Sequence, residues 1–291
     1  MSKIAASELI INARGAVYHL DVRPEELADT IILVGDPGRV AKVSKHFDRI
    51  EFQCAHREFI THTGYVGDKR ISVVSTGIGP DNIDIALNEL DALANIDFET
   101  REIKSNLQQL RLVRFGTSGS LQADIPVDSF VASSHGLGLD NLMNYYQYTA
   151  DQLNLDIAQA FSEQTGLRQE VTIPYVFSGS EMLLQKFGDD FYKGITVTCP
   201  GFFGPQGRVL RLPLSSPGLI NKLSEFRFNH HRITNFEMET SAIYGLGKMM
   251  GHECLSINVI IANRVIQEFS KDSEAAVEKM ILRALDVLTT A

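Results

Sequence analysis

Two arginines stand where short apolar runs give way to polar turns, a setting typical of anion-binding groups. One apolar run, residues 31–34, leads into the turn at 35–39, and another, residues 112–115, contains Arg114 and leads into the turn at 116–119. Glycine lets the backbone approach a ligand, and the free N–H groups of a helix start join with a guanidinium to bind an anion. The alternative at each place is a plain turn with an incidental arginine. Because a buried arginine requires an anionic partner, the two turns together favour a phosphate oxyanion. The candidate ligands are Gly35, Arg39, Arg114 and Thr117.

A third glycine-rich turn lies at residues 75–82, after another apolar run and before a helical pattern. Gly77, Gly79 and Pro80 indicate a backbone that turns sharply beside a ligand or a subunit interface, and a simple turn is the alternative. The turn at 35–39 has neither a GxxxxGK nor a GxGxxG pattern. A Walker loop and a dinucleotide fingerprint are therefore excluded there.

Two carboxylates, Glu237 and Glu239, flank Met238 where a predicted strand gives way to a helix. A carboxylate in that place can accept hydrogen bonds from a diol such as the 2′- and 3′-hydroxyls of ribose. The alternative is a helix start whose acidic first turn is stabilised by the helix dipole.

Aromatic rings that could stack on a planar base occur beside polar groups that could bind its edge, in residues 201–208. A glutamine side chain both donates and accepts hydrogen bonds, which suits the edge of a base. A further polar pair stands at residues 263–264. A Gly-Pro loop with incidental polar residues is the alternative. The candidates are Phe202, Phe203, Gln206, Arg208 and Arg264.

Metal-ligand and nucleophile signatures are missing. The histidines and carboxylates near residues 57–58, 230–231 and 252–253 match no metal-ligand spacing, and neither HExxH nor GxSxG occurs. The cysteines form no CxxC pair, so we predict buried thiols rather than a zinc site or a disulfide framework. These cysteines are Cys54, Cys199 and Cys254. We expect no metal and no cofactor.

The charge balance limits the size of the ligand. The 291 residues include 27 Lys and Arg against 36 Asp and Glu, a formal charge of −9. Binding to a nucleic-acid backbone needs clustered basic residues, so a broad nucleic-acid face is excluded, whereas a few arginines in one pocket can still bind a small anion. No apolar run reaches the length of a membrane span and no signal-peptide pattern opens the chain, so we expect a cytoplasmic protein without a membrane segment.

Strands and helices that alternate along the chain must position these groups. Short runs rich in Ile and Val predict buried strands, and segments of helical period lie between them. The predicted strands are residues 31–34, 71–75, 112–115, 130–133, 195–199 and 255–262. The predicted helices are residues 83–94, 152–164, 217–226, 238–249 and 273–288. Asp81 precedes the first helix, and Ser273 opens the last with Asp272 beside it, as N-caps do.

This alternation predicts an α/β fold with a central, mixed but largely parallel sheet flanked by helices. Neither a linker nor an internal repeat divides the chain, so we predict one domain over residues 1–291. The polar residues 96–109 lack a strong apolar stripe and are expected to form an exposed helical or loop insertion.

Together, and in this order, the motifs resemble the nucleoside phosphorylase family from about Tyr18 to the C-terminal helix, and most closely its members that act on uridine. Residues 35–39 are similar to the family's first phosphate loop, and residues 114–119 to its second. Residues 56–59 resemble the segment whose arginine, here Arg57, enters the phosphate site of the neighbouring subunit.

The resemblance also implies which residues bind the sugar and which bind the base. It implies that ribose is bound by His19, lent across a dimer to the 5′-hydroxyl, and by Thr117, Met238 and Glu239. Residues 202–208 look like the loop in which an aromatic ring packs on uracil while Gln206 and Arg208 bind its edge, with Arg264 in support. Asn263 stands where purine-specific relatives usually carry an aspartate, which favours a pyrimidine.

The implied reaction is reversible phosphorolysis of uridine to uracil and α-ribose 1-phosphate, on a single-domain phosphorylase fold. The implied catalytic groups are Arg39, Arg114, Gln206 and Arg208, with inorganic phosphate as the co-substrate. The groups that cross between subunits imply a homodimer as the smallest active unit, or a hexamer of three dimers. A purine nucleoside phosphorylase, a hydrolytic nucleosidase and a non-catalytic nucleoside-binding protein are the alternatives. The sequence departs from the family in a third turn that is one residue shorter, in the order Gly204-Pro205, and in the insertion at 96–109.

Overall fold

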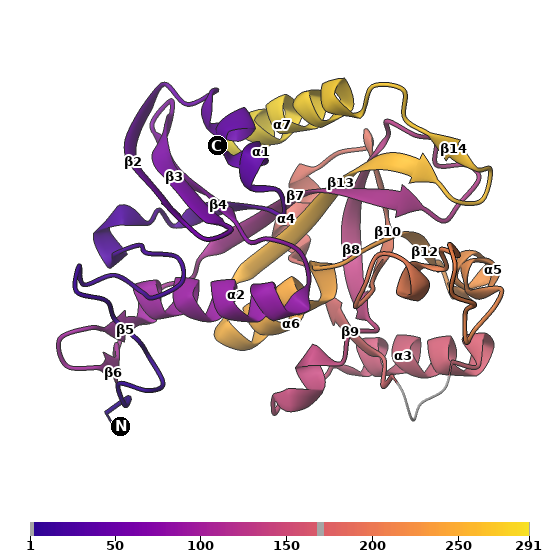
Figure 1. Cartoon of the computed structure of the whole chain (residues 1–291), viewed down its shortest axis with the longest axis horizontal. Helices are drawn as coiled ribbons and strands as arrows, with labels where there is room; N and C mark the ends of the chain where they lie inside the picture. Colours follow the sequence, from indigo (N-terminus) through magenta and orange to yellow (C-terminus); the bar gives the residue numbers. More distant parts are fainter. Residues whose placement is uncertain (1–2, 168–171, 291) are drawn as a thin grey trace.

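A large mixed β-sheet runs through the middle of the protein in the computed structural model, which describes residues 3–167 and 172–290 (Figure 1). The strands are β1 (Thr30–Val34), β2 (Arg49–His56), β3 (Phe59–Val66), β4 (Lys69–Ser75), β5 (Ile96–Asp97), β6 (Glu102–Ile103), β7 (Arg111–Ser120), β8 (Phe130–Gly138), β9 (Tyr175–Ser178), β10 (Phe191–Thr198), β11 (Arg227–Phe228), β12 (His231–Glu237), β13 (Glu253–Asn263) and β14 (Glu268–Phe269). The α-helices are α1 (Pro37–Ser44), α2 (Pro80–Asn95), α3 (Gln152–Thr165), α4 (Glu181–Lys186), α5 (Leu219–Glu225), α6 (Thr240–Met250) and α7 (Ser273–Thr289).

Five strands of this sheet close into a barrel. β7 pairs in parallel with β13 on one side and antiparallel with β12 on the other, and β8 and β10 complete the ring. Asn235 lies opposite Ser120, and Phe236 opposite Gly119, where β12 meets β7. Beyond β7 the sheet continues through β1 and β4 and ends in the hairpin of β2 and β3. The closure brings the end of β12, which is Glu237 and is followed two residues later by Glu239, beside the end of β7.

Helices cover both faces of the sheet. Alternate side chains of a strand point to opposite faces, so Ile31 and Leu33 pack with α2 and α6, whereas Ile32 and Val34 pack with α1 and α7. In Figure 1, α2 and α6 lie side by side below the sheet, and α7 lies beside α1 above it. Coverage on both faces explains why the central parallel strands are uninterrupted apolar runs.

The predicted α/β class with a mixed, mostly parallel sheet is confirmed, as are all six predicted strands and all five predicted helices. Two local predictions are wrong. Residues 116–119 are not a turn but part of β7, because β13 and β12 pair with them from the two sides. Asp81 does not cap α2, which begins at Pro80 after Gly79 and has no side-chain cap. Asp272 does cap α7, since its side chain accepts a hydrogen bond from the N–H of Ala275.

The polar segment 96–109 forms the short hairpin of β5 and β6 and then an exposed loop. Ile96 pairs with Ile103, and the Asp97 carboxylate accepts hydrogen bonds from the backbone N–H groups of Glu99 and Thr100. The helical alternative for this segment is therefore wrong, because the tight turn at Asp97 ends α2 in a hairpin. That residues 96–109 are an insertion relative to the family stays a prediction.

The thiols lie where the sequence predicts them, in or near the core. Cys199 and Cys254 are buried, Cys54 is half-buried, and all three are free. Within residues 3–167 and 172–290, no helix has the length and apolar character needed to cross a membrane.

Candidate active site

The predicted site segments meet at one cavity of about 720 Å³ beside the ends of β1 and β7 and the junction of β12 with α6. In open α/β sheets, ligands bind outside the carboxyl ends of the strands, and this cavity has that position. The structure brings together nine of the predicted site residues in its lining, from segments far apart in the chain. They are Gly35, Arg39, Arg114, Thr117, Phe202, Gln206, Arg208, Met238 and Glu239.

Arg39 is presented to the cavity by the first turn of α1. Asp36 caps this helix by accepting a hydrogen bond from the N–H of Gly38 at 2.9 Å, and Arg39 follows as the third helical residue. The Nη1 of Arg39 donates to the carbonyl oxygen of Phe115 at 3.1 Å, and no carboxylate of the described residues forms an ion pair with it. Burial, joined by the nearby charge of Arg114, lowers the pKa of Arg39. A bound anion would reverse this penalty, which suits Arg39 to phosphate.

Arg114 lies in the middle of β7, and its guanidinium passes over Gly116. A β-carbon on Gly116 would lie 1.7 Å from the Nη1 of Arg114, so a larger residue there would displace the guanidinium from this position. Nη1 donates to Asn258 Oδ1 at 2.7 Å, Nη2 donates to Glu239 Oε2, and the Glu237 carboxylate lies 3.4 Å from Nη2. Burial opposes the charged form of Arg114, but the charges of Glu239 and Glu237 outweigh it and raise the pKa of this arginine. Arg114 is therefore a fixed positive charge in the cavity wall.

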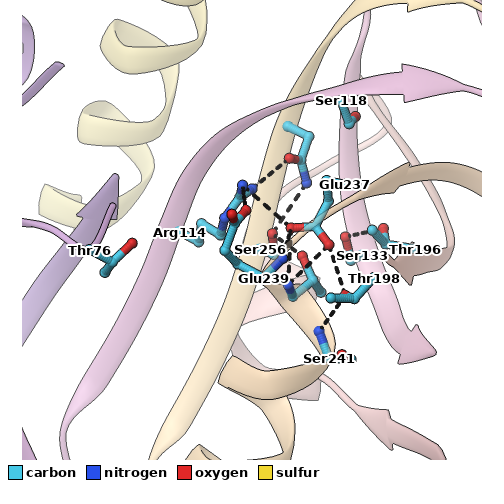
Figure 2. A network of polar contacts seen from close by, with 12 residues as sticks. Thr76, Arg114, Ser118, Ser133, Thr196, Thr198, Glu237, Glu239, Ser241 and Ser256 are labelled. Carbon is cyan, nitrogen blue, oxygen red and sulfur yellow. Dashed lines mark hydrogen bonds and ion pairs between the residues drawn. The ribbon is translucent and has the colours of Figure 1, made fainter. Parts of the chain in front are cut away.

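The two glutamates have different surroundings (Figure 2). Glu237 accepts hydrogen bonds from the hydroxyl of Thr198 at 2.8 Å and from two backbone N–H groups at the start of α6, at 2.9 and 3.0 Å. Glu239 accepts from the N–H of Gly79 at 2.8 Å and from Arg114, and burial raises its pKa even though Arg114 acts in the opposite direction. Glu237 is thus committed to the start of the helix, whereas Glu239 links the third glycine-rich turn to the arginine and is the better placed of the two for a diol.

Gln206 and Arg208 form a further pair in the cavity lining, at the end of the short helical turn Gly204–Gln206 and two residues after it. The Nη1 of Arg208 donates to Gln206 Oε1 at 2.6 Å and to the carbonyl oxygen of Phe202 at 2.7 Å, and its guanidinium lies 3.7 Å from the centre of the Phe202 ring. Burial, joined by the charge of Arg264, lowers the pKa of Arg208 to about 10. Positive charge beside an amide suits a planar group on which negative charge develops.

Two predicted base-binding residues lie outside the cavity lining. Arg264 acts on the loop instead, since its Nη1 donates to the carbonyl oxygen of Gln206 at 3.2 Å. Phe203 packs edge-to-face on Phe202 and remains 53% exposed. Both residues contact the loop at residues 202–208 from outside the cavity lining.

His19 and Arg57 also lie outside the cavity lining, and both lie beside the Tyr18 ring. The Nδ1 of His19 lies 2.7 Å from the carboxylate of Glu89, and the guanidinium of Arg57 lies 5.8 Å from the centre of the Tyr18 ring. Arg57 stands between β2 and β3 with a φ of 55°. The roles predicted for His19 and Arg57 at a neighbouring subunit stay a prediction.

Several further residues line the cavity that are not among the site residues predicted from the sequence. Some stand beside the predicted motifs and could have been found by extending them, and others come from the β13–β14 hairpin, which no motif marks. They are Asp36, Pro37, Glu58, Gly77, Ile78, Asn82, Ser118, Gly119, Phe236, Glu237, Ile261, Ala262 and Phe269.

Known proteins that are similar to this chain are named phosphorylases. The sequence matches the Phosphorylase superfamily over residues 29–289. A uridine phosphorylase of Thermococcus kodakarensis is 28% identical over 294 residues, 99% of this chain and 92% of that protein. A uridine phosphorylase of Haemophilus influenzae is 26% identical over 284 residues, 94% of this chain and 96% of that protein.

Solved structures agree with the sequence relatives. A Trypanosoma brucei nucleoside phosphorylase, whose crystal structure shows uridine phosphorylase activity, is 31% identical and superposes with a TM-score of 0.89 over 97% of this chain and 100% of that one. The sequence match covers more than half of the chain, and the superposition extends over nearly all of it. The chain therefore belongs to the phosphorylase superfamily.

Proposed function

We propose that this protein catalyses the reversible phosphorolysis of uridine, in which phosphate displaces uracil from C1′ and α-ribose 1-phosphate is formed. The observation that carries the proposal is one cavity that holds two arginines, a buried carboxylate and an amide–guanidinium pair. These groups belong to Arg39, Arg114, Glu239, Gln206 and Arg208. Relatives named uridine phosphorylases, which match nearly the whole chain, support it.

Phosphate would lie between the two arginines, with the N–H of Gly35 and the hydroxyl of Thr117 as further donors. Holding phosphate and nucleoside in line converts a bimolecular step into a unimolecular one, which can remove roughly 7–11 kcal/mol from the barrier. A phosphate oxygen forms the new bond to C1′ as the bond from C1′ to uracil breaks, and the electron pair of that bond leaves with uracil. The phosphate charge stabilises the positive charge that develops on the sugar as the bond to uracil breaks.

Negative charge on the departing uracil would be stabilised by Gln206 and Arg208. A preorganised donor of this kind contributes about 3–4 kcal/mol where it has been measured. Glu239 would accept hydrogen bonds from the ribose 2′- and 3′-hydroxyls, with Met238 against the sugar and Phe202 stacked on the base. Arg264 and Phe203 would act indirectly, by holding the loop.

Asn263 supports a pyrimidine rather than a purine. Its Nδ2 donates to the carbonyl oxygens of Gln122 and Ile125, both at 2.9 Å, and its Oδ1 accepts from the N–H of Val265 at 3.0 Å. The side chain is 1% exposed and saturated by backbone groups. It offers no proton to the imidazole ring of a purine.

A homodimer would complete the site. Arg57 does not line the cavity of its own chain and lies beside the Tyr18 ring, but Glu58, the next residue, lines that cavity. The turn that carries Arg57 therefore stands at the cavity rim. In a dimer, Arg57 of each subunit would reach the cavity of the other subunit. Arg57 of the partner subunit would add a third cation to the phosphate, and His19 of the partner subunit would reach the 5′-hydroxyl. A hexamer of three such dimers would keep both contacts.

Nucleoside and phosphate are the only partners in this proposal, with no metal or organic cofactor, no nucleic acid and no membrane. The arginines supply the charge that a metal would otherwise provide, and the net charge of −9 disfavours a polyanion. We place the reaction in the cytoplasm. Treatment with EDTA is expected to leave turnover unchanged.

A nucleoside panel with and without phosphate tests the proposal. Uridine, thymidine, inosine and adenosine are incubated with the protein, and free base and ribose 1-phosphate are measured. Phosphate-dependent release of uracil is the expected result. Release of purines without uracil would establish the purine alternative, and turnover without phosphate would establish a hydrolase. Saturable binding of uridine without any turnover would establish a binding protein.

A further inference from the structure

Arg114 has a neutral partner to which the proposed reaction assigns no part. Its Nη1 donates to the Oδ1 of Asn258 at 2.7 Å, and both side chains are buried. We propose that Asn258 is a positioning residue for phosphate, which fixes the guanidinium of Arg114 in the orientation that presents its remaining N–H donors to the anion. The inference rests on the proposed function, because it takes Arg114 to bind phosphate.

The strand register places the two side chains together. Asn258 on β13 lies directly opposite Gly116 on β7, and Arg114 precedes Gly116 by two residues, so all three share one face of the sheet. A β-carbon on Gly116 would lie 1.7 Å from the Nη1 of Arg114 and 2.5 Å from the Oδ1 of Asn258. The space above Gly116 is therefore where the guanidinium and the amide meet.

The orientation of the Asn258 amide is itself fixed. Its Nδ2 donates to the hydroxyl of Ser256 at 3.2 Å, and this hydroxyl accepts a hydrogen bond from Thr240 at 2.8 Å. Figure 2 shows Ser256 among the residues around Arg114 and the two glutamates. Because the amide nitrogen is engaged by Ser256, the amide oxygen must face Arg114. The position of the arginine is thereby linked to Thr240, the first residue of α6.

The neutrality of Asn258 matters as much as its geometry. Two carboxylates, those of Glu237 and Glu239, already contact the Nη2 of Arg114. A third carboxylate at position 258 would hold the guanidinium equally well, but it would offset more of the positive charge that attracts phosphate. An amide oxygen accepts the hydrogen bond and adds no net charge.

Two substitutions separate geometry from charge. Asn258→Leu removes the acceptor and is expected to weaken the binding of inorganic phosphate about tenfold or more and to lower kcat. Asn258→Asp keeps the acceptor, so it is expected to raise the KM for phosphate while kcat stays near that of the native enzyme. Phosphate affinity is measured by titration calorimetry, which requires no turnover, alongside kcat and the KM values for phosphate and uridine. A residue that only filled the core would give no such split between KM and kcat.

Asn154→Leu is the matched control. Asn154 is also buried and donates to the carboxylate of Asp151 at 2.7 Å, but it lies on α3 and does not line the cavity. The control is expected to lose thermal stability while phosphate affinity stays within about twofold of the native value.

Failure of this inference and failure of the proposed function give different results. Phosphate binding that is native-like in both Asn258 variants would overturn the positioning role, as would an equal loss in Asn154→Leu. If Asn258→Leu does not fold, the KM for phosphate of the near-isosteric Asn258→Asp decides alone. If the native protein binds phosphate and Asn258→Leu weakens that binding, but no uracil is released, the positioning role stands and the proposed reaction does not.

Discussion

Arg114 and Glu239 form a buried ion pair that joins the proposed phosphate site to the proposed ribose site. The two side chains are only 6% and 4% exposed, so water and salt screen their interaction little. The other oxygen of Glu239 accepts a hydrogen bond from the N–H of Gly79 at 2.8 Å. Glu239 thus connects the third glycine-rich turn to Arg114. A change at either charged residue is expected to affect both substrates.

Arg114→Ala is expected to lower kcat for phosphate-dependent uracil release by about 10²–10³-fold or more, because it removes a preorganised donor to the phosphate. The variant also leaves Glu237 and Glu239 buried without their cation, so its free energy of unfolding should fall. Arg114→Lys keeps a charge without the planar fork, and it should recover stability better than turnover.

Turnover and thermal unfolding are measured together for these variants. Arg111→Ala is the control, since Arg111 is exposed on the same strand. Native turnover in a folded Arg114→Ala protein would remove Arg114 from the site.

Gly116→Ala is expected to leave the protein folded and to impair the use of phosphate. The added β-carbon would meet the ends of the Arg114 and Asn258 side chains rather than backbone, so these side chains can move aside at the cost of their hydrogen bond. We expect kcat/KM for phosphate to fall about tenfold to a hundredfold, as for loss of a hydrogen bond to a charged group. Gly188→Ala, where the nearest atom would lie at 3.5 Å, is the control. Unchanged kcat/KM in Gly116→Ala would show that the position of the guanidinium does not matter.

Gln206→Ala is expected to impair the use of uridine and to leave phosphate affinity nearly unchanged. Gln206 is buried and holds the Nη1 of Arg208 at 2.6 Å, so its loss removes one contact to the base edge and frees the arginine. The kcat/KM for uridine should fall about tenfold or more, while phosphate affinity stays within about twofold. Steady-state kinetics with each substrate varied in turn gives both numbers. Equal losses for the two substrates would mean that Gln206 serves the whole cavity rather than the base.

Acid pH is expected to destabilise the fold through His135. Burial, joined by the charge of His231, lowers the pKa of His135 from 6.5 to about 4, with Asp151 acting in the opposite direction and His230 in the same one. Between these two values the unfolded chain binds a proton that the folded chain does not, so the free energy of unfolding falls as the pH falls from 6.5 to about 4. The loss amounts to about 3 kcal/mol for a shift of this size.

Urea unfolding between pH 4 and pH 8 measures this dependence. His135→Asn should flatten the curve on the acid side, while His230→Asn, at an exposed neighbour, should keep most of the slope. An unchanged slope in His135→Asn would assign the acid sensitivity to other groups.

The fold was predictable where a strand is buried on both faces, as in β1, because an apolar run then follows directly from the packing. The edge hairpin of β2 and β3 gives no such run, since along β2 exposed and half-buried residues alternate. Residues 116–119 have the composition of a turn, yet the pairing of β13 and β12 holds them in a strand. Tertiary pairing overrides local preference there.

The site residues also differ in whether a local sequence pattern or tertiary pairing places them. Some of them lie in motifs whose chemistry can be predicted from a few consecutive residues. These are Arg39, Glu239 and Gln206. Asn258 and Phe269 become neighbours of the site only through the register of β13 and the hairpin that follows it. Positions that depend on the closure of a barrel leave no local pattern, so the contacts that hold Arg114 could not be inferred from the sequence.

Mixing two inactive variants is expected to restore activity if the site is shared between subunits. In a dimer of one Arg57→Asn subunit and one Arg114→Ala subunit, the first subunit's cavity keeps its own Arg114 and receives an intact Arg57 from the second, so one site in the dimer is native. Asn is chosen because position 57 has a φ of 55°, which asparagine tolerates. When subunits exchange at random between equal amounts of the two variants, half of the dimers are mixed, and each mixed dimer has one native site out of two. The mixture should therefore have about a quarter of the native specific activity. Each variant refolded alone is the control. If the mixture is no more active than the two controls combined, Arg57 does not act across an interface, and the shared site is excluded.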